Sequence, residues 1–239
     1  MTKELEIGWF GKLPSSGDFG FRRLPRALLD DLDDWLRLGL TELRGSMPHD
    51  WKEVFTSAPT WNCAIPACVA GGNTLIGVLA PSHDRVGREF PLCAGVVLPG
   101  STAAIQLLAE AHGWLDTLGR IVIEARDHSL PLEDFDTSVR AIALPRPRAH
   151  AISSGGGEDI LGVLGAGPVD VPTVPMPLAH ALPWPELPMM FDAGNPTCFW
   201  WTHPGPGTPL RGFTSDIGLT PSLFVTLMRP LVPRKRIAS

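Results

Sequence analysis

The sequence predicts an α/β protein, because apolar runs of strand length occur between stripes of helical periodicity. Three runs, residues 61–69, 74–80 and 91–98, are rich in valine, isoleucine and leucine, as is typical of strands covered on both faces. Apolar side chains fall on one face of a helix between residues 28 and 43, and a second stripe extends from 104 to 122. We expect the 239 residues to form a single domain, near the upper limit of what one hydrophobic core can serve.

The first 48 residues predict a strand, a loop and a helix. Residues 5–11 are apolar and aromatic, and a loop over residues 12–24 follows them. Pro25 suits the first turn of the helix, because its missing N–H would have no partner there. Gly45 and Pro48 then end the helix.

The middle of the chain alternates turns with strands and then becomes helical. The turn at residues 71–73, Gly-Gly-Asn, predicts an antiparallel hairpin between the first two runs. The loop between the second and third runs, residues 81–89, is unusually polar. Ser101 or Thr102 can cap the helix that bears the second stripe, and another helix is expected over residues 131–143.

The C-terminal part, residues 146–239, is expected to be a proline-rich extension that packs on the body of the protein. Residues 165–210 hold 11 of the 25 prolines, which excludes long regular elements there. A late strand is expected over residues 197–202, and Thr220 with Pro221 opens a final helix.

Composition excludes several classes of function. A net charge of −5 with 19% charged residues gives no nucleic-acid footprint. No apolar stretch reaches the roughly 18 residues that a membrane-spanning helix needs, and the N-terminus lacks the apolar core of a signal peptide. We therefore expect a cytoplasmic protein with reduced cysteines. The spacing of Cys63 and Cys68 does not match a zinc set, so neither metal nor cofactor is expected.

Candidate catalytic residues are few. His83, Asp84 and His203 could supply a general base or a metal site, which would suit a small hydrolase or phosphate-handling enzyme. No HExxH, GxSxG or phosphate-loop frame accompanies them. Binding of another protein is therefore the preferred interpretation, and catalysis is the alternative.

Charged residues set among apolar strands suggest an ion-pair or docking motif. Asp18, Asp84, Arg85 and Arg88 lie in two loops that can meet at one edge of a sheet, and a charge removed from water needs a partner. We predict that Asp18 pairs with Arg85 or Arg88, since arginine binds carboxylates in a bidentate manner. The sequence leaves open whether this motif is scaffold or docking surface.

A further set of residues is a candidate binding surface. Two adjacent tryptophans in a strand point to opposite faces, so at least one of them needs cover from a helix, the proline-rich segment or a partner. The candidate surface residues are Lys12, Ser16, His83, Trp200 and Trp201.

Two long motifs occupy most of residues 7–98. The first motif reads GWFGKLPSSGDF over residues 8–19, with RRLP over 22–25. The second reads APTW over residues 58–61 and GVLAPSHDRVGREFPL over 77–92. Both lie within an α/β core at residues 1–145. In their order and spacing the two motifs resemble the TagF family of type VI secretion-associated proteins.

The resemblance to TagF implies both a fold and a function. The implied fold is a three-layer αβα sandwich around a mixed sheet. The implied function is post-translational negative regulation of type VI secretion assembly. The implied partners are a forkhead-associated scaffold protein and, in some bacteria, a kinase and phosphatase pair. No enzymatic activity is implied.

Overall fold

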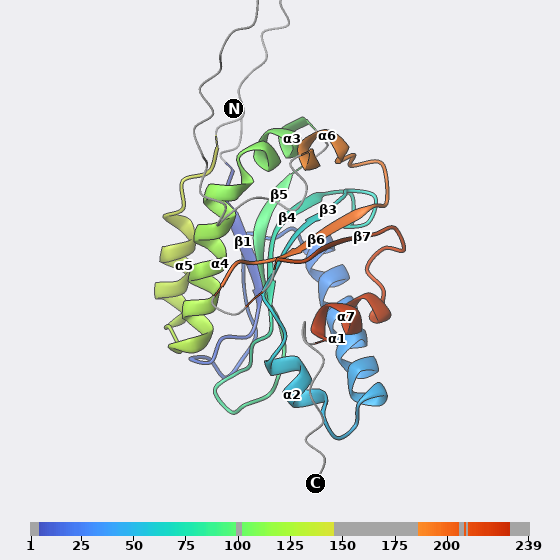
Figure 1. The fold of residues 1–239 in the computed structure, drawn as a ribbon. Helices are drawn as coiled ribbons and strands as arrows, with labels where there is room; N and C mark the ends of the chain where they lie inside the picture. Colours follow the sequence, from blue (N-terminus) through green and yellow to red (C-terminus); the bar gives the residue numbers. More distant parts are fainter. Residues whose placement is uncertain (1–4, 99–101, 146–185, 206–207, 209, 230–239) are drawn as a thin grey trace, which may run out of the picture.

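Seven strands form one sheet in a computed structural model that describes residues 5–98, 102–145, 186–205, 208 and 210–229 (Figure 1). Their order is β2-β1-β5-β4-β3-β6-β7. The strands are β1 (Ile7–Gly11), β2 (Gly20–Arg22), β3 (Trp61–Ile65), β4 (Thr74–Ala80), β5 (Leu92–Leu98), β6 (Cys198–Thr202) and β7 (Gly212–Ser215). Much of the expected proline-rich extension, residues 146–185, lies outside the described residues, as does the tail at 230–239.

Every strand pair among the described residues is antiparallel. The α/β class is thus confirmed, whereas the expected mixed sheet is wrong. The physical reason is connectivity. Short connections join β1 to β2, β3 to β4, β4 to β5 and β6 to β7, and such connections place neighbouring strands antiparallel.

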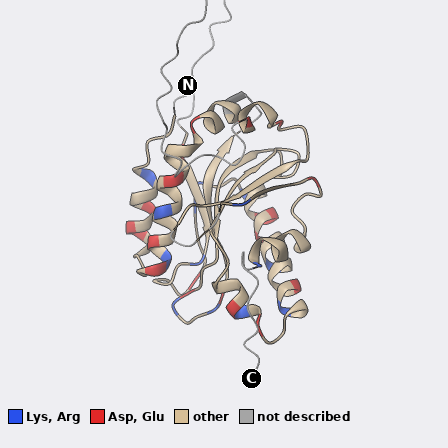
Figure 2. Ribbon diagram, viewed as in Figure 1, with Lys and Arg blue, Asp and Glu red and all other residues tan. Residues whose placement is uncertain are grey.

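Helices lie on both sides of the sheet, and the buried side chains form two clusters. The helices are α1 (Arg26–Ser46), α2 (Trp51–Thr56), α3 (Thr102–Ala109), α4 (Ala111–Asp127), α5 (Leu132–Arg140), α6 (Leu187–Met190) and α7 (Pro221–Met228). One cluster joins side chains of α1, α2 and α7 to one face of the sheet, and the other joins α3, α4, α5 and α6 to the opposite face (Figure 1). Charged residues gather on the helices and loops, while the strands are nearly free of them (Figure 2).

The long elements agree with the sequence predictions. The apolar stripe of the first helix is buried along α1, and the Gly71–Asn73 turn joins β3 to β4 in the predicted hairpin. All residues of β3 and β4 are buried, which confirms that these strands are covered on both faces. Thr220 caps α7 by accepting a hydrogen bond from the Leu223 N–H at 3.2 Å.

The differences concern short elements and one helix boundary. The helix expected across residues 104–122 is divided at Glu110 into α3 and α4, although its apolar stripe is buried along both. Four short elements, β2, β7, α2 and α6, were not predicted from the sequence, because their three to six residues are too few to show a periodicity.

No helix of the described part of the chain is long and apolar enough to cross a membrane.

A partly buried ion pair fastens α5 to the edge of the sheet. The Arg23 guanidinium donates Nη1 to Asp136 Oδ2 at 3.0 Å and Nη2 to Oδ1 at 2.7 Å, and its Nε donates to the Ile7 carbonyl at 2.8 Å. Trp9 Nε1 donates to the same Oδ1 at 2.6 Å. Burial alone would raise the pKa of the Asp136 carboxyl. Hydrogen bonds from Arg23 and Trp9 and the nearby positive charges outweigh burial and hold that pKa below its usual value.

Replacing Asp136 should make stability less dependent on pH. Asp136→Asn should lower the free energy of unfolding by about 2–3 kcal/mol near pH 7, because Arg23 loses its counter-ion. A carboxyl with a depressed folded pKa stabilises fully above its unfolded pKa of about 3.9, and this contribution is lost as the pH falls through the folded pKa. The difference in unfolding free energy between wild type and variant should therefore become smaller below about pH 4.

Urea unfolding of both proteins at neutral pH and at successively lower pH values measures that difference. Asp134→Asn is the matched control, because Asp134 is an exposed acid of the same helix and its loss should cost at most about 0.5 kcal/mol. A difference for Asp136→Asn that stays constant with pH would contradict the assigned role of its carboxylate.

Candidate functional site

Two loops far apart in sequence meet at one end of the sheet. Gly11 and Ala80, the last residues of β1 and β4, both lie opposite Leu92, so the loops that follow them start at the same level. The Arg85 N–H donates to the Ser16 carbonyl at 2.8 Å, which binds one loop to the other. The expectation that these loops meet at one edge of the sheet is confirmed.

A fully buried carboxylate, Asp84, joins the two loops. Its Oδ2 accepts Lys12 Nζ at 2.9 Å and Arg88 Nε at 2.6 Å. Its Oδ1 accepts the backbone N–H groups of Val86 at 3.1 Å and Arg88 at 2.9 Å. The Asp84 side chain is 0% exposed and that of Lys12 is 8% exposed. We call Lys12, Asp84 and Arg88 the Asp84 cluster.

The surroundings of Asp84 keep its carboxyl ionised. Burial would raise its pKa. The hydrogen bonds from the Arg88 N–H, the Lys12 and Arg88 side chains and the Val86 N–H outweigh burial and hold the pKa far below its usual value. A carboxylate that is ionised and already accepts four hydrogen bonds is suited to ordering loops, and it has no proton to donate near neutral pH.

The predicted Asp18 ion pair is wrong, because Asp84 is the acid that binds the arginine. Asp18 is exposed and forms no ion pair with any described residue. Its N–H donates to Ser16 Oγ at 3.3 Å in a local turn. Asp84 lies four residues before Arg88 in a tight turn in which Gly87 has φ +78°, so the acid and the base of one loop meet directly.

Helix α2 and an aromatic cluster support the loop between β4 and β5. Lys52 of α2 lies 3.1 Å from Glu89 Oε1, whose side chain is 4% exposed. Phe19 packs edge-on against Phe90, with ring centroids 4.7 Å apart, and Lys12 Nζ lies 4.9 Å from the centroid of the Phe19 ring. Residues from both loops and from a helix therefore hold the Asp84 cluster in place.

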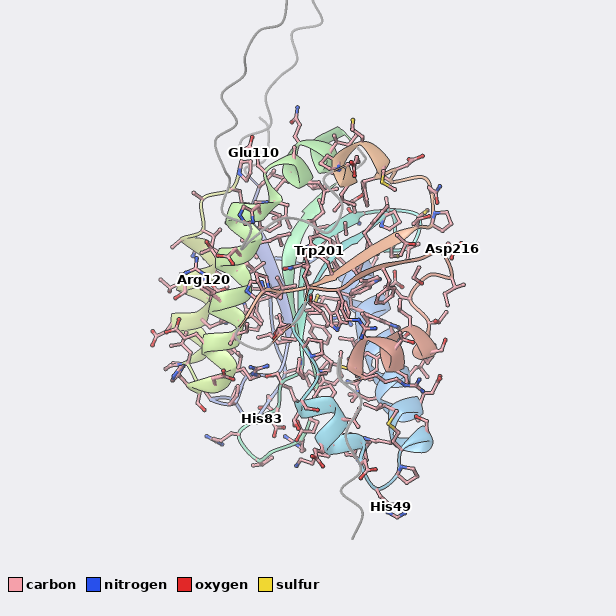
Figure 3. All side chains as sticks on the ribbon, in the orientation of Figure 1. His49, His83, Glu110, Arg120, Trp201 and Asp216 are labelled. Atoms are coloured by element: carbon pink, nitrogen blue, oxygen red, sulfur yellow. The ribbon has the colours of Figure 1, made fainter. Side chains whose placement is uncertain are left out.

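Three of the five candidate surface residues are buried. Trp200 and Trp201 lie in the two opposite core clusters, so the predicted splitting of the pair between the two faces is confirmed, and their assignment to a binding surface is wrong. Lys12 is buried against Asp84 and does not form part of the surface either. Ser16 and His83 are half-buried; Figure 3 shows His83 on the loop at one end of the sheet, away from Trp201 among the strands.

The exposed side chains of the site include three residues of the predicted ion-pair or docking motif. Asp18, Arg85 and Arg88 of that motif are exposed, and so are Phe19 and Val86, which were not among the candidate residues.

The three residues of the enzyme alternative do not form an acid–base pair. His83 Nδ1 lies 2.9 Å from the backbone carbonyl of Asp84, and the Asp84 carboxylate is bound by other groups. His203 is buried against α4, where a Cβ on Gly119 would lie 2.3 Å from its ring. Within the described residues, no group of three or more His, Cys, Asp or Glu side chains could hold a metal ion.

Arg23–Asp136 and Lys52–Glu89 are among the ion pairs that were not predicted from the sequence. A signal existed for the first. Asp136 follows Leu132 by four residues and precedes Val139 by three, so it lies on the apolar face of its helix, where an acid needs a partner. The partner of Glu89 could not be predicted, because the helix that carries Lys52 was itself missed.

Removing the Asp84 charge should destabilise the protein far more than removing the Asp18 charge. Asp84→Asn leaves the buried Lys12 ammonium without a counter-ion and should cost about 3 kcal/mol of unfolding free energy. Asp18→Asn removes an equal charge at an exposed position and should cost less than about 0.5 kcal/mol. Chemical denaturation of the three proteins measures both values; equal losses would show that Asp84 does not organise the loops.

Comparisons with known proteins bear on the family and the fold of the chain. The family model for the TagF N-terminal domain, described as type VI secretion system-associated, matches residues 8–142 of the sequence. The match therefore includes both loops. The crystal structure of PA0076 from Pseudomonas aeruginosa PAO1 superposes with a TM-score of 0.67 at 23% identity, covering 96% of this chain and 99% of that one, which supports the fold. No curated protein matches the sequence. The chain belongs to the TagF family of type VI secretion-associated proteins.

Proposed function

We propose that this protein is a cytoplasmic, post-translational negative regulator of type VI secretion assembly that binds a scaffold protein containing a forkhead-associated domain. The observation that carries the proposal is the TagF match over residues 8–142, which places the Asp84 cluster inside the family's domain. The structure supports binding by this region, because the cluster orders two loops whose outer side chains remain exposed.

The chemistry of the site favours binding over turnover. Asp84 accepts hydrogen bonds from four donors and is held ionised. The carboxylate of the enzyme alternative is therefore already used to hold the loops together. A rigid surface that already has its bound geometry loses little conformational entropy when a partner docks.

Repression would follow from occupancy. A regulator that binds the unassembled scaffold removes it from the assembling form by mass action. The degree of repression should therefore rise with the concentration of the regulator relative to its scaffold, without turnover of a substrate.

The proposal also covers the whole chain as one TagF-like domain. Helices on both faces of the sheet would form the three-layer arrangement implied by the resemblance.

Genetic titration in the native host tests the proposed function. Deleting the gene should raise secretion of type VI substrates at unchanged levels of the structural components, and graded overproduction should silence secretion in proportion to its level. Quantitative immunoblots of secreted and cellular fractions give both readouts. Unchanged secretion after deletion, in cells that express the apparatus, would refute negative regulation.

Co-purification tests the partner. Affinity purification of the full chain from the native host should recover the forkhead-associated scaffold. Recovery of other proteins without the scaffold would refute the choice of partner while leaving the secretion result intact.

A further inference from the structure

The exposed part of the loop between β4 and β5 has the chemistry of an anion-recognition site. We propose that Arg85, Val86 and Arg88, called here the arginine rim, bind an acidic segment of the partner protein. The two guanidinium groups bind its carboxylates, and Val86 supplies an apolar contact beside them. This inference rests on the proposed function for its partner and adds the chemistry that the partner must present.

Two side-chain hydrogen bonds hold Arg88 in place, and its guanidinium has further N–H donors that bind no described residue. Its Nε donates to Asp84 at 2.6 Å and its Nη2 donates to the Gly17 carbonyl at 2.7 Å, while its side chain is 63% exposed. Nη1 makes no hydrogen bond to any described residue. A planar guanidinium held at two points loses little further freedom when it binds a carboxylate.

Arg85 lies at the tip of the same turn without a counter-ion in the described structure. Its N–H is bound to the Ser16 carbonyl at 2.8 Å, which fixes the backbone. Its side chain is exposed and forms no ion pair with any described residue. The Gly87 N–H donates to the Asp84 carbonyl at 2.9 Å and closes the turn, and Val86, next to Arg85, is 67% exposed.

The distribution of charge makes this surface locally positive on a protein of net charge −5. The two acids of the loop, Asp84 and Glu89, are buried, with exposed side-chain fractions of 0% and 4%. Lys12 and Arg88 share the single Asp84 carboxylate, which leaves an excess of positive charge there. Asp18 is the exposed acid of the neighbouring loop.

Complementarity therefore favours an anionic partner with an apolar residue nearby. Arginine binds a carboxylate through two parallel hydrogen bonds, which gives both strength and orientation. Val86 and Phe19, which is 39% exposed, offer apolar contact beside the charges. Two arginines are too few for a nucleic-acid surface, which needs a longer basic stripe. An acidic peptide segment fits this small, fixed rim.

Fluorescence anisotropy of the full chain with a labelled octaglutamate peptide at low ionic strength tests the rim directly. The wild type should bind the peptide, and Arg85→Glu should weaken binding by at least roughly tenfold, because it replaces a donor with a like charge. Arg211→Glu is the matched control: Arg211 is exposed on the loop before β7 and the charge change is the same, so binding should stay within about twofold.

Thermal unfolding checks that each variant is folded, and Arg85→Ala replaces Arg85→Glu if the latter is not. No binding by the folded wild type, equal losses in the Arg85 and Arg211 variants, or displacement by inorganic phosphate in preference to free glutamate at the same ionic strength would each overturn the carboxylate assignment. The assay contains no secretion component, so its failure leaves the proposed negative regulation standing. Failure of the genetic titration would leave peptide binding by the rim intact.

Discussion

The site depends on one buried carboxylate. Asp84 is removed from water, and a charge in that position costs several kcal/mol unless it is paired and hydrogen-bonded. Lys12 and Arg88 supply the charges, and two backbone N–H groups of the same turn saturate the other oxygen. Since Lys12 follows β1 and the turn follows β4, satisfying this carboxylate obliges the two loops to meet.

A second acid that is largely removed from water is paired in the same way at the edge of the sheet. Asp136 of α5 is satisfied by Arg23 and Trp9, and Arg23 also caps the Ile7 carbonyl. Arg23 has a positive φ of 58°, an uncommon conformation for a non-glycine residue, and it is held there by three side-chain hydrogen bonds. Ion pairs thus fix the loop ends, while apolar packing on both faces holds the sheet.

Periodicity and turn chemistry sufficed to predict the long elements but not the pairing of charges. The apolar stripe of α1 and the hairpin at Gly71–Asn73 follow from local sequence. Whether Asp18 or Asp84 pairs with the arginine depends on which of the two side chains turns into the protein, and local sequence does not determine that. Burial of Trp200 and Trp201 on opposite faces followed from strand alternation, but their complete cover required knowing where the helices of the two core clusters pack. Membership of the TagF family could be predicted because its motifs are long and lie on these same loops.

Amide hydrogen exchange followed by NMR tests most directly whether Asp84 orders the two loops. The N–H groups of Val86 and Arg88 donate to Asp84 Oδ1, and that of Arg85 donates to Ser16, although all three residues are exposed. The account predicts that these three amides exchange more slowly than an unstructured loop in the wild type. It also predicts that Asp84→Asn speeds their exchange while the amides of β4 and β5 stay protected. Fast exchange of all three in the wild type, at the rate of an unstructured loop, would contradict the claim that the Asp84 cluster holds the loops together.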